Sequence, residues 1–151
     1  MIKWYSSKDL KIYFDKKPDP DIRFVEPGMT DKEIKDISEK PFILKNTVFC
    51  QVDYKKCIHD FKIEVGFTWD GATIPRFAWP IIGSKTDNRF LIASMVHDTL
   101  CKHHEYVKNN RYLSTKIFVA LLEVAKVNKI KQFLMFHTVD NYQKLCWEEK
   151  N

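Results

Sequence analysis

The pattern of apolar and polar residues changes its period near the middle of the chain. In the first half, short runs rich in β-branched and aromatic residues alternate between apolar and polar positions and are separated by turn residues. The runs that predict strands are 10–14, 22–25, 42–54 and 59–69. In the second half, apolar residues recur at helical spacing, which predicts helices over 90–104, 117–125 and 130–147. We therefore expect an α+β protein, with a small antiparallel sheet in the N-terminal half followed by a three-helix C-terminal half.

A polar segment in the first half carries the signals of a short helix. Thr30 and Glu33 have the spacing of a capping box, and Pro41 closes the segment. A chain of 151 residues suits one domain and is long enough to bury a core without disulfides. We expect a single domain over residues 1–151. Its parts are mainly strands and turns over 1–69, a loop over 70–87 and helices over 88–147.

The charge balance does not select a partner. The 25 basic and 20 acidic residues give a net charge of +5, and the lysines are spread along the chain instead of forming one dense block. Such a surface is compatible with weak attraction to anionic lipid, cell-wall polymer or nucleic acid, but it carries no specific nucleic-acid signal.

The sequence predicts a cytoplasmic product. No run approaches 18 consecutive apolar residues, so we expect no transmembrane span. The first residues, Met1-Ile-Lys-Trp4, do not have the pattern of a signal peptide. We expect the four scattered cysteines to be reduced thiols. They are Cys50, Cys57, Cys101 and Cys146.

One stretch has the residue types that chemistry needs. The loop Asp70-Gly-Ala-Thr-Ile-Pro-Arg76 is followed twenty-one residues later by His97-Asp98 inside a predicted helix. The apolar spacing places the His97 ring on the inward face of that helix, where it is either a core histidine or a general base. A carboxylate at Asp98, beside a buried face, is costly unless it is paired, hydrogen-bonded or bound to a metal.

Two interpretations of this cluster remain open. In the first, the Arg76 guanidinium pairs with Asp70 or Asp98 and pins the loop to the helix as a structural clasp. In the second, the same residues line a cleft in which His97 activates a water, while Asp70 or Asp98 orients the ring or binds a cation. Both interpretations place the four side chains together.

A zinc site is a further alternative on the same helix. His97, Cys101 and His104 lie at i, i+4 and i+7, so they can share one side of a helix. No CxxC or HExxH pattern accompanies them. The stretch 103–105 is instead typical of a polar helix end, where histidines suit the negative end of the helix dipole.

Four short motifs occur in order in the chain: Asp70-Gly-Ala-Thr-Ile-Pro-Arg76, Trp79-Pro80, His97-Asp-Thr-Leu-Cys101 and Arg111-Tyr-Leu-Ser-Thr-Lys-Ile-Phe118. Together they resemble a family of small phage and prophage proteins of unassigned function. Those proteins carry an Asp-Gly-Ala-Ser-Ile-Pro-Arg-like loop, a Trp-Pro segment, a His-Asp-x-Leu-Tyr helix and an Arg-x-x-Ala-Asp-x-x-Phe helix. The resemblance spans about residues 60 to 147, and it implies a viral or prophage origin without a known activity.

The helix pair is also similar, more distantly, to prokaryotic secretory phospholipase A-2. This resemblance implies that His97 is the general base, that Asp98 is a calcium ligand, and that position 115 holds the residue that orients the histidine. Thr115 stands there in place of an aspartate, and a hydroxyl cannot stabilise an imidazolium by charge. Cys101 also replaces the expected tyrosine. Asp140 or Asp87 could supply the missing carboxylate.

Two classes of function follow. The first is a His-Asp hydrolase that acts on esters or amides of the host envelope. The second is a non-catalytic virion, tail-associated or assembly protein that works with other phage proteins. In either case the protein is made in the host cytoplasm, and virion association is expected for the second class. Trp4, Tyr5 and Tyr13 form either a docking edge or part of the core.

Overall fold

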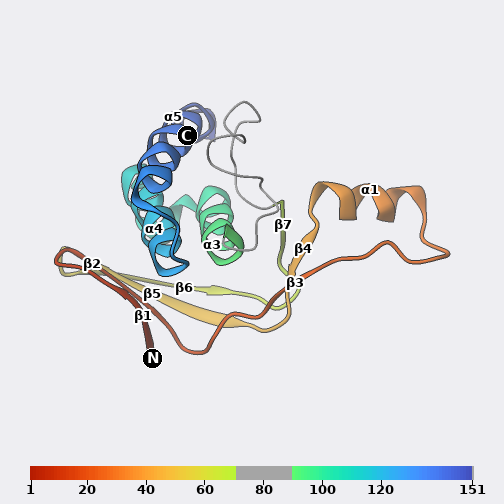
Figure 1. Cartoon of the computed structure of the whole chain (residues 1–151), viewed down its shortest axis with the longest axis horizontal. Coiled ribbons are helices and arrows are strands. Elements are labelled where there is room, and N and C mark those ends of the chain that lie inside the picture. Colours follow the sequence, from red (N-terminus) through yellow and green to blue (C-terminus); the bar gives the residue numbers. More distant parts are fainter. Residues whose placement is uncertain (71–89, 151) are drawn as a thin grey trace.

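The computed structural model describes residues 1–70 and 90–150, and it has the expected α+β architecture. Antiparallel sheets occupy the N-terminal half, and helices follow in the C-terminal half (Figure 1). The predicted fold class is therefore confirmed.

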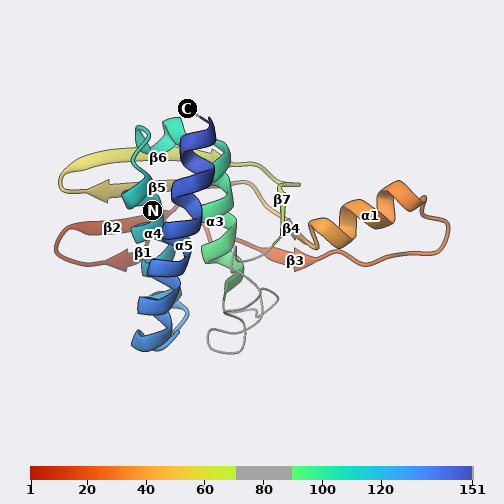
Figure 2. The same ribbon diagram turned by 90° about the horizontal axis from the view of Figure 1, so that it is seen from above.

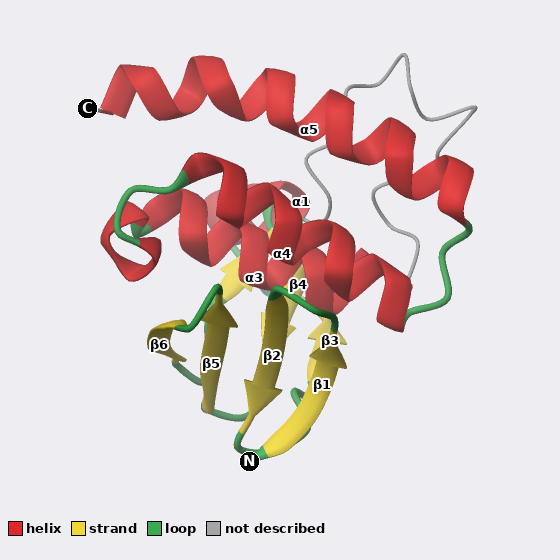
Figure 3. Ribbon diagram, turned by 90° about the vertical axis from the view of Figure 1, so that its left-hand side faces the viewer, coloured by secondary structure: helices red, strands yellow, loops and turns green. Residues whose placement is uncertain are grey.

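The larger sheet has four antiparallel strands in the order β1-β2-β5-β6. Their bounds are β1 Ile2–Ser6, β2 Leu10–Phe14, β5 Val48–Tyr54 and β6 Cys57–Ile63. Alternate residues of β2, β5 and β6 are buried, as the period of two in the sequence requires. One face of this sheet therefore packs against the helices, and the other face lies open (Figure 3).

A smaller sheet has three strands in the order β3-β4-β7. Their bounds are β3 Pro20–Ile22, β4 Phe42–Leu44 and β7 Thr68–Trp69, and helix α1 (Asp31–Glu39) lies between β3 and β4. The predicted capping box is present at the start of α1, because the Thr30 hydroxyl accepts from the backbone N–H of Glu33 at 3.2 Å and donates to its carboxylate at 3.1 Å. Helix α1 projects away from the rest of the molecule (Figure 2).

From residue 90 onward, the described chain forms three helices and a 3-10 helix. They are α3 (Leu91–Lys102), the 3-10 helix η3 (His104–Val107), α4 (Arg111–Val124) and α5 (Lys129–Lys150). Helix α4 begins six residues before the expected start, because the Asn110 side chain accepts from the backbone N–H of Leu113 at 3.0 Å and caps it there. No helix in the two described stretches is long and apolar enough to cross a membrane.

The structure corrects two predicted strands, because each is broken by a turn that the apolar alternation does not reveal. The predicted strand 42–54 is divided into β4 and β5 at a turn where the Asn46 side chain donates to the Lys17 carbonyl and accepts from the Asp19 N–H, both at 3.0 Å. The predicted strand 59–69 is divided into β6 and β7 by a turn in which Gly66 has φ 92°. The first break takes the chain from the smaller sheet into the larger one, and the second returns it to the smaller sheet.

The start of the chain also differs from expectation. Strand β1 was not predicted, and the third strand covers Pro20–Ile22 instead of 22–25. Trp4 and Tyr5 of β1 are partly buried against the core, and the Trp4 ring meets Phe14 edge-on at 5.3 Å. These two aromatics therefore contribute to packing.

The core lies between the larger sheet and the helices. Its largest fully buried side chains are Trp69, Phe14, Phe90, Phe118, Ile12, Leu44, Ile63, Met95, Leu100, Leu113 and Ile117. These residues come from both sheets and from α3 and α4, so the two halves of the chain share one apolar cluster.

His59 makes the stability of this core depend on pH. It is a buried residue of β6, and burial lowers its pKa from the ordinary 6.5, with the positive charge of Lys108 acting in the same direction. As pH falls, His59 is therefore protonated at a higher pH in the unfolded chain than in the folded chain. Stability contributed by neutral His59 is present above pH 6.5 and is lost as pH falls below it.

We predict that the free energy of unfolding of the wild type decreases from pH 7 to pH 5, and that His59→Gln reduces this decrease. Denaturant titrations at both pH values measure the slope. His137→Gln, which changes an exposed histidine on α5, is the matched control and should leave the slope unchanged. Equal slopes for wild type and His59→Gln would contradict the prediction.

Candidate functional site

Helix α3 presents one row of polar side chains to strand β7. Ser94, Asp98 and Lys102 follow one another at intervals of four residues, so they lie on one side of the helix. The Trp69 indole N–H donates to the Ser94 hydroxyl at 3.1 Å, and the Lys102 ammonium lies 5.0 Å from the centre of the Phe67 ring. Asp98 therefore lies on the side of α3 that faces the strand ending next to Asp70.

His97 lies on a different side of α3. It is only 3% exposed, and its ring centre is 5.1 Å from that of Phe118 on α4. The Cys101 sulfur, one turn later on α3, lies 3.8 Å from both ring nitrogens. The inward orientation expected from the apolar spacing is confirmed. The adjacent residues His97 and Asp98 thus face different neighbours, α4 and β7.

A polar cluster joins α4 to α5 close to the same interface. The Arg111 guanidinium pairs with the Asp140 carboxylate and also donates to the Asp140 backbone carbonyl at 3.1 Å. The Thr115 hydroxyl lies 3.3 Å from the Arg111 carbonyl and 3.3 Å from the Asp140 carboxylate. Thr115 is fully buried and lies one turn before Phe118, so it shares the side of α4 that touches His97.

The structure brings together only some of the residues that the sequence singled out. The Asp140 carboxylate lies 3.3 Å from the hydroxyl of Thr115, the position where the phospholipase resemblance expects an aspartate. Asp98 forms an ion pair with Lys102, at 3.2 Å. Arg76 and Asp87 lie outside the described residues, so the clasp through Arg76 and the alternative carboxylate at Asp87 stay predictions.

Arg111 also belongs to this cluster, although its sequence position indicated no role for it. Its spacing of four residues from Thr115 places the two side chains on one side of α4. That spacing was the available signal, but the pairing with Asp140 spans 29 residues of chain and depends on how α5 packs. Local spacing alone could not reveal it.

The described residues do not by themselves form a metal site. Among the side chains that the structure describes, no group of three or more His, Cys, Asp or Glu is placed to hold a metal ion. His104, the third member of the proposed zinc trio, stacks on Trp147 with ring centres 3.6 Å apart. The Asp98 carboxylate, expected to bind calcium, has the Lys102 ammonium beside it. The described residues therefore do not fit a calcium or zinc ion.

The fold and site define an α+β protein in which a buried histidine lies between two helices. Comparison with known families places the chain in one of them: residues 46–139, more than half of the chain, match DUF1353, described as a protein of unknown function. The chain belongs to this family. No curated protein and no solved structure matches it significantly. The matched segment includes every candidate residue from Asp70 to Thr115, whereas Asp140 directly follows it.

The Arg111–Asp140 pair should contribute measurably to stability. The two side chains are 27% and 23% exposed, so neutralising one leaves the other charge in a partly desolvated place. We predict that Asp140→Asn lowers the free energy of unfolding by about 1 kcal/mol, a value reduced for the remaining solvent exposure.

Denaturant titration at neutral pH measures this loss. Glu39→Gln is the matched control, because Glu39 pairs with Lys35 at 3.9 Å and those side chains are 62% and 76% exposed. Its effect should be close to zero. Equal losses of unfolding free energy in the two variants would contradict the prediction that the less exposed pair contributes more.

Proposed function

We propose that this protein is a phage- or prophage-encoded hydrolase of ester or amide bonds in the host envelope, with His97 as its general base. The proposal is supported by the placement of the imidazole at the α3–α4 interface, opposite the side of α4 that carries Thr115. The phage origin rests on the four sequence motifs and their resemblance to phage and prophage proteins.

The contact between Thr115 and Asp140 is the observation that carries the proposal. A threonine hydroxyl alone orients an imidazole but does not stabilise its positive charge. When that hydroxyl donates to a carboxylate, its lone pairs become better acceptors. The carboxylate lies one hydrogen bond from that hydroxyl, and its pairing with Arg111 offsets part of its negative charge. Asp140 therefore compensates for the absence of an aspartate at position 115.

In the proposed reaction, one ring nitrogen of His97 keeps its proton and donates a hydrogen bond to the Thr115 oxygen. The other nitrogen removes a proton from water as the water oxygen attacks the carbonyl carbon of the substrate. The imidazolium then returns that proton to the departing alcohol or amine, and the carbonyl re-forms as the bond breaks. Asp98 takes no part in these steps, because it lies on the side of α3 that faces β7 and not α4.

A second candidate is a non-catalytic virion, tail-associated or assembly protein that binds other phage proteins. It is favoured by the burial of His97, which is 3% exposed, so that a substrate reaches the ring only when covering side chains move. In this case the histidine and the cluster around Thr115 hold α3, α4 and α5 together.

Hydrolysis assays with His97→Asn distinguish the two candidates. If His97 is the base, activity toward short-chain esters, phospholipid vesicles or peptidoglycan should fall by about 10²–10⁴-fold. Thr115→Val should cause a smaller loss, because the imidazole is then poorly oriented but still present. The assays are run with and without added calcium, and melting temperatures are measured for every variant.

His137→Asn is the matched control, because His137 is an exposed histidine on α5 and should retain full activity. Wild type without activity on every substrate, or a His97→Asn variant as active as wild type, would reject the hydrolase. A lower melting temperature in His97→Asn with unchanged activity would support the structural role.

A further inference from the structure

Residues 20–41 form an arm at one end of the molecule. The arm comprises β3, α1 and their connections, and it extends to the right of the body in Figure 1. Its exposed apolar side chains are Phe24 (70%), Val25 (56%), Ile22 (49%) and Ile34 (37%). Side chains of this size, gathered on a projecting segment, are typical of a docking surface.

The arm is acidic, whereas the rest of the chain is basic. It contains six acidic and four basic residues, and the remainder contains 14 acidic and 21 basic residues. Two of its carboxylates are already paired within the arm, Asp36 with Arg23 and Glu39 with Lys35. The other four acidic residues are Asp21, Glu26, Asp31 and Glu33. Within the described part of the chain, no cationic side chain lies within 4.0 Å of their carboxylates.

Lysines surround a hollow at the opposite end of the molecule. The hollow has a volume of about 320 Å³ and is formed by the β1–β2 and β5–β6 turns. Its lining residues are Lys8, Asp9, Lys11, Asp53, Lys55 and Lys56. Among the residues that the structure describes, none of these four lysines has a carboxylate within 4.0 Å. We call this surface the lysine hollow.

The lysine hollow also has an apolar neighbour. Lys11, Asp53 and Ile58 are direct partners across β2, β5 and β6, so their side chains project from the same face of the sheet. Ile58 is 56% exposed. The hollow therefore offers both features that complement the arm, positive charge and an exposed apolar side chain.

The turn that carries two of the lysines is unusual in its composition. Lys55 and Lys56 both have positive φ, 50° and 66°, in a two-residue turn where Asn and Gly are preferred. The backbone N–H of Lys55 donates to the Asp9 carbonyl at 2.9 Å, which joins this turn to the β1–β2 turn. Two adjacent lysines therefore lie at the tip of the sheet, at positions whose backbone conformation disfavours lysine.

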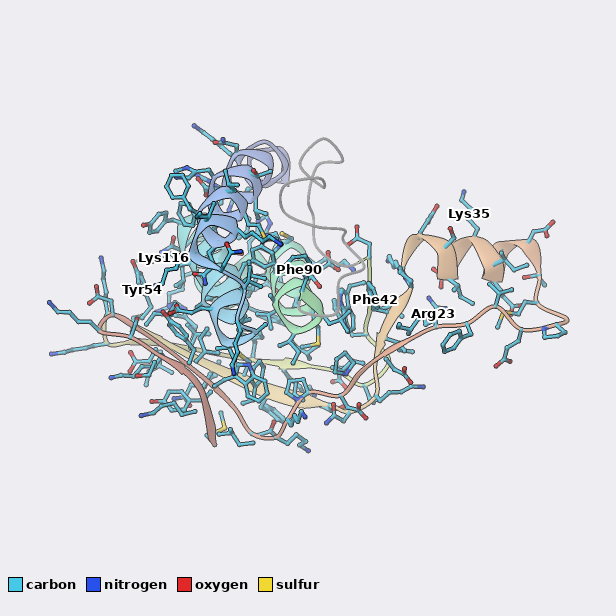
Figure 4. All side chains as sticks on the ribbon, in the orientation of Figure 1. Arg23, Lys35, Phe42, Tyr54, Phe90 and Lys116 are labelled. Carbon is cyan, nitrogen blue, oxygen red and sulfur yellow. The ribbon has the colours of Figure 1, made fainter. Side chains whose placement is uncertain are left out.

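We propose that the arm of one molecule docks into the lysine hollow of a second copy of the same chain. The two surfaces lie at opposite ends of the longest axis, as the positions of Arg23 and Lys35 at one end and Tyr54 at the other show (Figure 4). An arm therefore cannot reach its own hollow. An acidic arm repels nucleic acid and anionic lipid, whereas the hollow of another copy matches it in charge and provides Ile58 for apolar contact.

The expected assembly is head to tail. The two partners use different surfaces, so each docked molecule leaves one free arm and one free hollow. Repetition of this contact gives a ring if the rotation between neighbours closes, and a filament if it does not. The inference does not rest on the proposed hydrolase.

Light scattering coupled to size-exclusion chromatography, over a range of protein concentrations, tests the proposal. Wild type should form oligomers whose mass rises with concentration at low salt and falls at 1 M NaCl, where the Debye length is about 3 Å. The double variant K55E/K56E should be monomeric, because its hollow is acidic. The double variant E26K/D31K should also be monomeric, because its arm is basic.

Mixing the two variants gives the sharpest result. The basic arm of one fits the acidic hollow of the other, and the unchanged arm and hollow fit each other as well, so the mixture should regain the wild-type mass. Phe24→Ser should weaken association about tenfold without changing its salt dependence. K16E/K17E, which changes an exposed lysine pair outside the hollow by the same charge, is the matched control and should associate like wild type.

Four results would overturn the proposal. They are a monomeric wild type at every concentration, continued association of K55E/K56E, no recovery on mixing, and loss of association in K16E/K17E. If the wild type is monomeric, its binding to anionic vesicles or oligonucleotides is measured next. Binding that is lost in K55E/K56E would show that the hollow binds a lipid or nucleic-acid phosphate instead of the arm. Circular dichroism of each variant checks that it is folded.

Discussion

The hydrogen bond from the Trp69 indole to the Ser94 hydroxyl is the contact on which the arrangement of the site depends. Trp69 is fully buried, so its N–H needs an acceptor within the protein. Ser94 supplies that acceptor, and its own hydroxyl donates a hydrogen bond to the Leu91 carbonyl at 3.0 Å. The bond fixes the rotation of α3 against β7. With the helix so oriented, Asp98 faces the strand, and His97, the next residue around the helix, faces α4.

Features that depend on local spacing could be predicted from the sequence. The helical period of the second half placed His97 on an inward face, and burial at 3% agrees with it. The interval between Thr30 and Glu33 located α1, because a capping box needs only four consecutive residues. The change from a period of two to a helical period gave the α+β class. Each of these signals requires no knowledge of the tertiary structure.

Features that depend on distant contacts could not be predicted. The turns at Asn46 and Gly66 interrupt segments whose apolar alternation continues, and Asn46 is fixed by partners at Lys17 and Asp19. The second sheet exists only because those turns redirect the chain. In the site, the cluster of Arg111 and Asp140 forms only when α5 packs on α4. Asp140 and Asp87 were two possible carboxylates from the sequence, and the position of Asp140 beside Thr115 required the structure.

The arm leaves and re-enters the body at neighbouring points. Ile22 pairs with Phe42, the Arg23 N–H donates to the Pro41 carbonyl at 2.7 Å, and the Arg23 guanidinium donates to the Lys40 carbonyl at 3.1 Å. The segment between these points can therefore be lengthened, shortened or exchanged without moving the strands at its base. Because loop-closure entropy rises only slowly with length, such changes cost little stability. The arm precedes the segment matched to the family, so its length and composition can change while the matched strands and helices keep their places.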